Sequence, residues 1–193
     1  MLIVGVDEAG RGPWAGPVVA AAVILRGAVP AGLDDSKKLS AQRRAVLFTE
    51  LQASACLVGV GQASVAEIDA LNILKATHLA MVRAVEALID SCGAEPFQIL
   101  VDGNRLPDWR WPARAIVGGD GLEPCISAAS IIAKVTRDAM MAELDVEHPG
   151  YGWARNQGYG TPAHAEALRR LGVTMHHRRS FAPIRACLEE IHG

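Results

Sequence analysis

The chain has 193 residues and a mass of 20.4 kDa, the size of one domain with a core of its own. Half of its residues are hydrophobic and 21% are charged, which is typical of a soluble globular protein. The net charge of −2 excludes the overall basic excess of most nucleic-acid binders. Setting four carboxylates aside as metal ligands would leave +2, and residues 151–193 hold six arginines against three glutamates, so a locally positive face is compatible with this composition.

Cysteine spacing and hydropathy exclude several other classes. No two of the four cysteines form a Cys-x-x-Cys pair, which argues against a zinc knuckle or a disulfide framework: Cys56, Cys92, Cys125 and Cys187. The longest apolar run, Pro17 to Leu25, is about half of the ~20 residues that a transmembrane helix needs. The N-terminus meets two acids without a basic region before them, unlike a signal peptide. We therefore expect a cytoplasmic protein without a membrane span.

The apolar runs predict strands first, then alternating helix and strand, and finally helices alone. Unbroken apolar runs predict buried strands over Leu2–Val6, Val18–Leu25, Cys56–Gly61, Phe97–Val101 and Ala115–Val117. Capping signals predict one helix over Ala41–Ala53 after Ser40 and another that begins at the Ser64-Val-Ala-Glu67 capping box. Two longer helices are predicted over Ile73–Asp90, with Gly93 as the stop, and over 127–147. The last two are predicted from Thr161-Pro162 to Gly172 and over Ala182–His192. This order indicates a mixed sheet with helices on its faces and a helical C-terminal portion.

Three predicted strands end at acidic residues. Asp7 and Glu8 follow the first strand, Asp102 follows the fourth, and Asp120 follows Gly118-Gly119 after the fifth. Any one acid taken alone could equally be a turn former or a helix cap. Converging carboxylates repel one another, and a divalent cation removes that conflict. Because the proposed ligands are all oxygens, the pattern favours Mg²⁺ or Mn²⁺ over zinc.

A glycine-rich turn follows the first two acids. Gly10-Arg11-Gly12-Pro13 lets the backbone approach a ligand closely, although a plain tight turn has the same composition. The turn lacks the Gly-Lys-Ser/Thr of a P-loop and the spacing of a dinucleotide fingerprint, so a nucleotide hydrolase loses support. The histidines, among them His148, His164, His176 and His177, show no metal-ligand pattern and are interpreted as surface or structural residues.

The string Asp7-Glu8-Ala9-Gly10-Arg11-Gly12-Pro13 resembles the signature of ribonuclease HII, the type 2 RNase H family. Further matching motifs follow in order along nearly the whole chain: Asp35-Ser-Lys-Lys-Leu39, Leu71-Asn-Ile-Leu74, Val101-Asp-Gly103, Ser127-Ala-Ala-Ser-Ile-Ile-Ala-Lys134, Thr136-Arg-Asp138, Gly158-Tyr-Gly-Thr161 and His177-Arg-Arg-Ser-Phe181.

The resemblance implies an α/β protein with an RNase H-like fold, a five-stranded mixed sheet flanked by helices with a helical C-terminal segment. It implies a catalytic core over 1–145 and a C-terminal segment over 146–193 packed on it. It also implies that Asp7, Glu8, Asp102 and Asp120 are the catalytic, metal-binding acids, whereas Asp138 lies on a predicted helix and is interpreted as structural.

The same resemblance implies how substrate is bound. Gly10, Arg11 and Gly12 would sense the ribose 2′-hydroxyl, the group that distinguishes RNA from DNA, and Tyr159 would stack on the next deoxyribose. Phosphates would be contacted or approached by Lys37, Lys38, Asn72, Ser127 and Lys134. Lys37 and Lys38 could equally be a solvated pair, and Lys134 could neutralise acids within the fold. Asn156-Gln157 stand where many members have His-Lys.

The function implied is hydrolysis of the RNA strand in RNA–DNA hybrids and 5′ of single ribonucleotides in duplex DNA. A monomeric enzyme with two Mg²⁺ or Mn²⁺ ions would leave 3′-hydroxyl and 5′-phosphate ends. Two alternatives remain: another two-metal DNA nuclease, which has no reason to carry both Gly-Arg-Gly and Tyr159, and a noncatalytic duplex-binding module, which has no use for four converging carboxylates.

Overall fold

Five strands form one mixed sheet in the computed structural model, which describes residues 2–93, 95 and 98–192. The strands are β1 (Ile3–Ala9), β2 (Val18–Ile24), β3 (Leu57–Ala63), β4 (Gln98–Asp102) and β5 (Ala113–Ile116), in the order β3-β2-β1-β4-β5. β1 pairs antiparallel with β2 and parallel with β4, β2 is antiparallel to β3, and β4 is parallel to β5. The expected five-stranded mixed sheet is confirmed.

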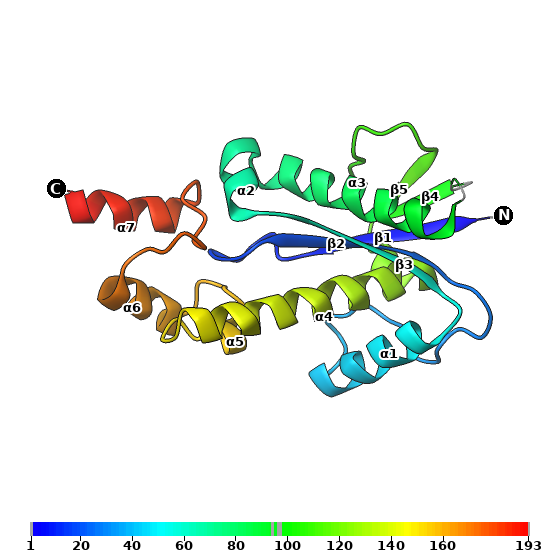
Figure 1. Ribbon diagram of the computed structural model, residues 1–193, viewed down its shortest axis with the longest axis horizontal. Coiled ribbons are helices and arrows are strands. Elements are labelled where there is room, and N and C mark those ends of the chain that lie inside the picture. Colours follow the sequence, from blue (N-terminus) through cyan, green and yellow to red (C-terminus); the bar gives the residue numbers. More distant parts are fainter. Residues whose placement is uncertain (1, 94, 96–97, 193) are drawn as a thin grey trace.

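Helices cover both faces of this sheet (Figure 1). They are α1 (Ala41–Ala53), α2 (Val65–Leu71), α3 (Ile73–Cys92), α4 (Pro124–Glu147), α5 (Trp153–Asn156), α6 (Pro162–Leu171) and α7 (Ala182–His192), with a 3-10 turn η1 at Gly119–Gly121. α3 packs on β2 and β3 from one face, whereas α4 packs on β1 and β2 from the other and carries α1 on its outer side. The helices α5, α6 and α7 lie together at the end of the molecule opposite the N-terminus.

Small residues in the sheet allow the helices to approach it closely. β2 is buried along its whole length, as its unbroken Val/Ala run predicts. A Cβ at Gly5 in β1 would collide with the backbone of Cys125 and Ile126. The N-terminal turn of α4 therefore packs directly against the central strand. Two core clusters lie between the sheet and the helices, one on each face. A third core cluster joins the end of α4 to the C-terminal helices and to the segment after β1: Ala15, Met141, Tyr151, Trp153, Ala167, Leu168 and Ile184.

The predicted capping signals are present. Ser64 and Glu67 form the capping box of α2, Ser40 caps α1, and Thr161 caps α6. α4 begins at Pro124, three residues before the predicted start, because proline fits the first turn of a helix. α5 was not predicted.

Several strand boundaries differ from those predicted. β1 extends beyond Val6 to Ala9 and β3 to Ala63, and β5 ends at Ile116. Phe97, the first residue of the predicted fourth strand, lies outside the described residues. None of the described helices combines the length and apolarity needed to cross a membrane. The division of the chain at residue 145 stays a prediction.

Candidate active site

Three carboxylates meet at one edge of the sheet. β1, β4 and β5 run parallel, so their carboxyl ends share that edge, and Asp102 is the last residue of β4. η1 follows β5 and carries Asp120, whose backbone N–H donates to Asp102 Oδ1 at 3.3 Å. One carboxylate oxygen from each of Asp7, Asp102 and Asp120 lies within 4.8 Å of the others. The fold therefore brings together three of the four acids predicted from the strand ends.

Glu8 approaches the same edge from the other face of the sheet. Asp7 pairs with Ala21 and Glu8 with Ala20, and consecutive side chains on a strand point to opposite faces. Asp7 thus lies on the α4 side, where a cavity of about 280 Å³ also contains Lys37 and Tyr159. Glu8 lines this cavity and a second one of about 410 Å³ on the α3 side. The acids straddle the end of the sheet.

Burial and mutual repulsion make these carboxylates costly to ionise. Asp7 is 3% exposed, and desolvation, followed by the charges of Glu8 and Asp102, raises its pKa well above the usual value. Desolvation likewise raises the pKa of Glu8, against the opposing effect of Arg11, and the pKa of Asp120, with Asp102 adding to it.

One oxygen of the cluster is left without a protein partner. Asp7 Oδ2 is the single buried side-chain polar atom among the described residues that has no hydrogen bond. An orphaned buried carboxylate oxygen beside two further carboxylates is a donor set that fits a hard divalent cation.

Lysines partly neutralise the cluster. Lys37 Nζ lies 3.3 Å from Asp120 Oδ2. Desolvation opposes the Lys37 ammonium, but the charges of Asp7 and Asp120 outweigh it and raise its pKa. Lys38 is more distant and pairs with Asp34 at 3.3 Å, with 62% of its side chain exposed. Both side chains are accessible to a ligand.

The other predicted phosphate contacts have partners within the protein. The Ser127 hydroxyl is buried and donates to the backbone carbonyl of Asp120 at 2.6 Å. The Asn72 side chain accepts from the N–H groups of Leu74 and Lys75 and so caps α3. Lys134 Nζ lies 2.6 Å from Asp138 Oδ1, one turn along α4, and lines the 280 Å³ cavity. Ser127 therefore lies behind Asp120 rather than on the surface.

Gly10, Arg11, Gly12 and Tyr159 line that cavity together with the acids. Gly10 has a φ of 95°, a conformation that side chains rarely adopt, and a Cβ there would collide with Arg137. Arg11 Nη1 lies 3.3 Å from Glu8 Oε1. Tyr159 is 46% exposed, and a Cβ at Gly12 would lie 3.4 Å from its ring.

The turn that carries Tyr159 is ordered by the two residues that depart from the family pattern. Asn156 Oδ1 accepts from the N–H of Gly158, and its amide donates to the carbonyl of Tyr151, each at 2.8 Å. Gln157 has a φ of 49°, and its amide donates to the carbonyl of Ala154. These side chains thus hydrogen-bond to the backbone of the turn.

Two buried arginines, which lie in matching motifs but were given no role from the sequence, hold the glycine-rich segment in place. The Arg178 guanidinium donates to the carbonyls of Gly10, Arg11, Gly16 and Pro17. The Arg137 guanidinium donates to Ala15, Pro17 and Gln157 and so joins this segment to the Tyr159 turn. Burial lowers the pKa of Arg137 to about 10 and that of Arg178 to about 9, values at which both stay charged near neutral pH.

Comparison with known proteins shows which family has this sequence and fold. The sequence pattern of ribonuclease HII matches residues 4–184. The chain belongs to the ribonuclease HII family. A ribonuclease HII from Sphingopyxis alaskensis is 63% identical over 183 residues, which cover 95% of this chain and 90% of that protein. Another from Rhizorhabdus wittichii is 63% identical and covers 94% of this chain and 88% of that protein.

A solved structure agrees with the family assignment. The crystal structure of the ribonuclease H2 from Pyrococcus horikoshii OT3 is 28% identical, covers 100% of this chain and 99% of that one, and superimposes with a TM-score of 0.77. The RNase H-like fold implied by the sequence resemblance is confirmed. This ribonuclease HII is therefore a divalent-metal-dependent ribonuclease H that acts on nucleic acid.

Proposed function

We propose that this ribonuclease HII cuts on the 5′ side of ribonucleotides in duplex DNA, as well as in RNA–DNA hybrids, and leaves 3′-hydroxyl and 5′-phosphate ends. One observation carries the proposal: three of the acids, Asp7, Glu8 and Asp102, line a single cavity together with Gly10-Arg11-Gly12 and Tyr159. A strand whose scissile phosphate lies at the acids would place its neighbouring sugars against the glycines and the ring. The 2′-hydroxyl is the feature that such a surface can test.

Asp7 and Asp102 are the proposed central ligands of two Mg²⁺ or Mn²⁺ ions, with Glu8 and Asp120 each completing one site. When bound, this pair of ions activates the attacking water and stabilises the leaving 3′-oxygen. The positions of Asp7 and Glu8 on opposite faces of β1 support the division, because each carboxylate reaches the edge from its own side.

The remaining polar residues orient the substrate and the acids. Lys37, exposed beside Asp120, and Lys38, exposed beside Asp34, contact phosphate oxygens without reading bases. Lys134, in the same cavity, exchanges its contact with Asp138 for a phosphate. Asn72 is exposed, and because its oxygen caps α3, its amide nitrogen is the group proposed to contact a phosphate, whereas Ser127 fixes the backbone of Asp120.

Cleavage of matched duplexes tests the proposal. One duplex is all DNA and the other contains a single ribonucleotide, each with the labelled strand resolved at single-nucleotide length. We expect one cut, immediately 5′ of the ribonucleotide, and none in the all-DNA duplex. Cleavage of both duplexes would indicate a general two-metal DNA nuclease, and binding without cleavage would indicate a duplex-binding module.

The cellular setting follows from the substrate. The similar ribonucleases HII are bacterial proteins, and bacterial chromosomes lie in the cytoplasm. We accordingly propose that the enzyme works there, as a monomer, since one chain supplies every residue of the cavity.

A further inference from the structure

The C-terminal part of the chain contains two pairs of histidines in different chemical situations. His164 and His177 are buried, and their Nε2 atoms lie 3.1 Å apart. His164 Nδ1 also lies 2.9 Å from the carbonyl of Tyr159, and His177 Nδ1 accepts from the N–H of Thr174 at 3.0 Å. All four ring nitrogens are engaged, so this pair is structural.

His148 and His176 form the second pair, and their nitrogens are not engaged in this way. Their ring centroids lie 4.8 Å apart, and neither imidazole makes a hydrogen bond within the described residues. One ligand atom from each ring and one oxygen of Glu147 all lie within 4.8 Å of one another. The expectation that no histidine joins a ligand-like group was wrong here, because His176 meets residues 147 and 148 only through the fold.

Hydrogen bonds fix the main chain at both histidines. His148 is the C-terminal cap of α4, and its N–H donates to the carbonyl of Leu144 at 2.9 Å. The carbonyl of His176 accepts from the N–H of Gly16 at 2.9 Å, and its N–H donates to Thr174 Oγ1 at 3.2 Å. The fully buried Trp153 ring lies 6.0 Å from His148 and 6.1 Å from His176. Both imidazoles therefore lie next to the same buried tryptophan ring.

We propose that Glu147, His148 and His176 form a Zn²⁺ site, separate from the acids at the sheet edge, with water in the fourth position. Two imidazoles and one carboxylate are a donor set that zinc accepts, and the carboxylate also offsets part of its charge. Imidazole nitrogen favours zinc, nickel and copper, whereas Mg²⁺ prefers oxygen. The two sites thus differ in donor chemistry and select different ions.

Zinc at this site would add a cross-link between the C-terminal end of α4 and the segment that precedes Arg178, which the third core cluster already brings together. Figure 1 shows the C-terminal end of α4 beside α5 and α6. His148 belongs to that end of α4, whereas His176 precedes Arg178, the residue that holds the carbonyls of Gly10 and Arg11. The bound ion would therefore stabilise the anchorage of the glycine-rich segment without taking part in the chemistry.

Co²⁺ is a suitable probe, because a four-coordinate site with nitrogen ligands gives intense visible absorption and a six-coordinate oxygen site gives little. The metal-free full chain is titrated with Co²⁺ in excess Mg²⁺, which occupies the acidic site. We expect one absorbing equivalent that added Zn²⁺ displaces. His148→Gln and His176→Gln should each weaken this binding by more than about tenfold, as loss of a ligand must exceed the effect of losing an outer-shell partner.

Three further variants make the titration decisive. Asp102→Asn removes an acid of the other site, and His78→Gln removes a half-buried histidine of α3, so both should keep the absorption. Glu147 is exposed, so Glu147→Gln folds normally and should weaken Co²⁺ binding by itself. Unchanged binding in Glu147→Gln and in both histidine variants would overturn the proposal, and so would loss of the absorption in Asp102→Asn.

Discussion

Gly12 and Tyr159 line the same cavity and lie so close together that a Cβ on Gly12 would be 3.4 Å from Cε1 of the ring. Tyr159 is nevertheless 46% exposed. The ring therefore contacts the glycine-rich backbone and keeps enough free surface to pack against a ligand.

Replacing Tyr159 should therefore impair cleavage at a single ribonucleotide. Loss of an aromatic stacking contact costs about 1–3 kcal/mol, which is roughly tenfold to a hundredfold in rate at subsaturating substrate. Tyr159→Ala should show this loss on a duplex with one ribonucleotide and a smaller loss on a long hybrid. Tyr159→Phe is the control and should retain most activity, because the ring makes the contact. Equal losses on both substrates would mean that Tyr159 is only structural.

Arg178→Lys should disturb the glycine-rich segment next to Tyr159, because Arg178 donates to the carbonyls of Gly10 and Arg11. Lysine keeps the charge but cannot reproduce the guanidinium fork, and a buried carbonyl left without a donor costs about 1–3 kcal/mol. We expect a lower thermal midpoint and, because the glycine-rich segment shifts, a loss of about 10²-fold in cleavage at a single ribonucleotide.

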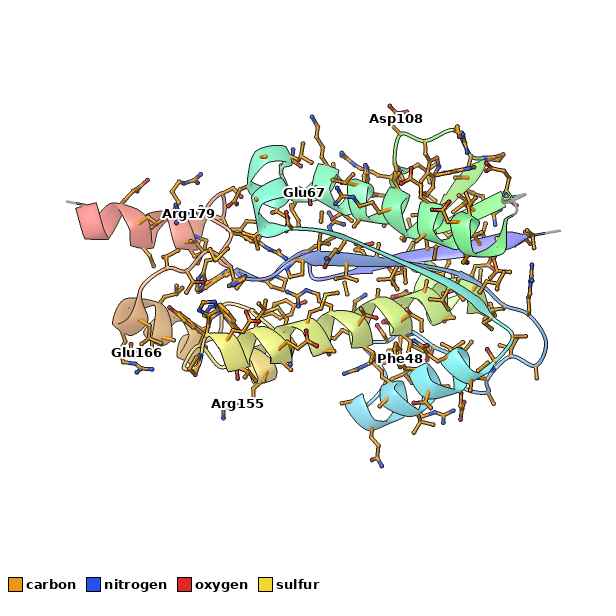
Figure 2. The ribbon with its side chains drawn as sticks, in the orientation of Figure 1. Phe48, Glu67, Asp108, Arg155, Glu166 and Arg179 are labelled. Carbon is orange, nitrogen blue, oxygen red and sulfur yellow. The ribbon has the colours of Figure 1, made fainter. Side chains whose placement is uncertain are left out.

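Arg179→Lys is the matched control for Arg178→Lys. Arg179 is exposed and lies between the start of α7 and α2 (Figure 2), where its backbone N–H donates to Asp69. Its replacement should leave stability and cleavage close to those of the wild type. Equal effects of the two substitutions would show that the buried fork has no special role.

Asp7→Asn should remove activity and stabilise the metal-free protein. The raised pKa of Asp7 means that folding favours its protonated form, so stability is fully present at low pH and declines as pH rises through the folded-state pKa. Asparagine resembles the protonated form and should raise the thermal midpoint at neutral pH but not near pH 4, about the usual carboxyl pKa. Cleavage should fall by about 10²–10³ or more, the scale of losing a preorganised electrostatic group.

Asp90→Asn supplies the comparison for that experiment, because Asp90 is an exposed carboxylate on α3 far along the helix from the acids. It should change neither activity nor stability measurably. A lower thermal midpoint for metal-free Asp7→Asn at neutral pH would assign Asp7 a structural role instead.

Protons should compete with the activating metal at a higher pH than they do at ordinary carboxylates. The pKa values of Asp7, Glu8 and Asp120 are all raised, so each carboxylate must lose its proton before it can act as a ligand. The Mg²⁺ concentration for half-maximal cleavage should rise as pH is lowered through the raised pKa values, by up to about tenfold per pH unit for each proton displaced. Lys37→Met should steepen this rise, because the ammonium favours ionised Asp120. EDTA should stop cleavage, and low zinc should not restore it. A half-saturation that does not vary with pH would contradict the expectation.

Local patterns were sufficient to predict the class of the sheet and the convergence of acids at one of its edges. Buried apolar runs that end in acids define β4 and, with the glycines after it, β5, so Asp102 and Asp120 could be placed at one edge. The predicted end of β1 at Val6 was wrong, because the pairing of β1 with β2 continues past the acids: Asp7 pairs with Ala21, Glu8 with Ala20 and Ala9 with Val19. Two consecutive acidic residues such as Asp7 and Glu8 resemble the end of a buried strand until the neighbouring strand that pairs with them is known.

The arginines could not be predicted for a different reason. An arginine in a helix or a loop usually lies on the surface with its charge in water. Arg137 and Arg178 are buried because backbone carbonyls more than 100 residues away in sequence satisfy their donors. Only the folded chain brings those carbonyls together.

The position of Arg178 has a consequence for synthesis of the enzyme. Every acid of the proposed site has left the ribosome once residue 120 is clear of it, whereas Arg178, the donor that holds Gly10 and Arg11, is translated later. A nascent chain that has not yet reached Arg178 therefore contains the acids without the donor that holds the glycine-rich segment, which we propose tests for a ribonucleotide. On that proposal, the chain acquires its selectivity only once Arg178 has been made.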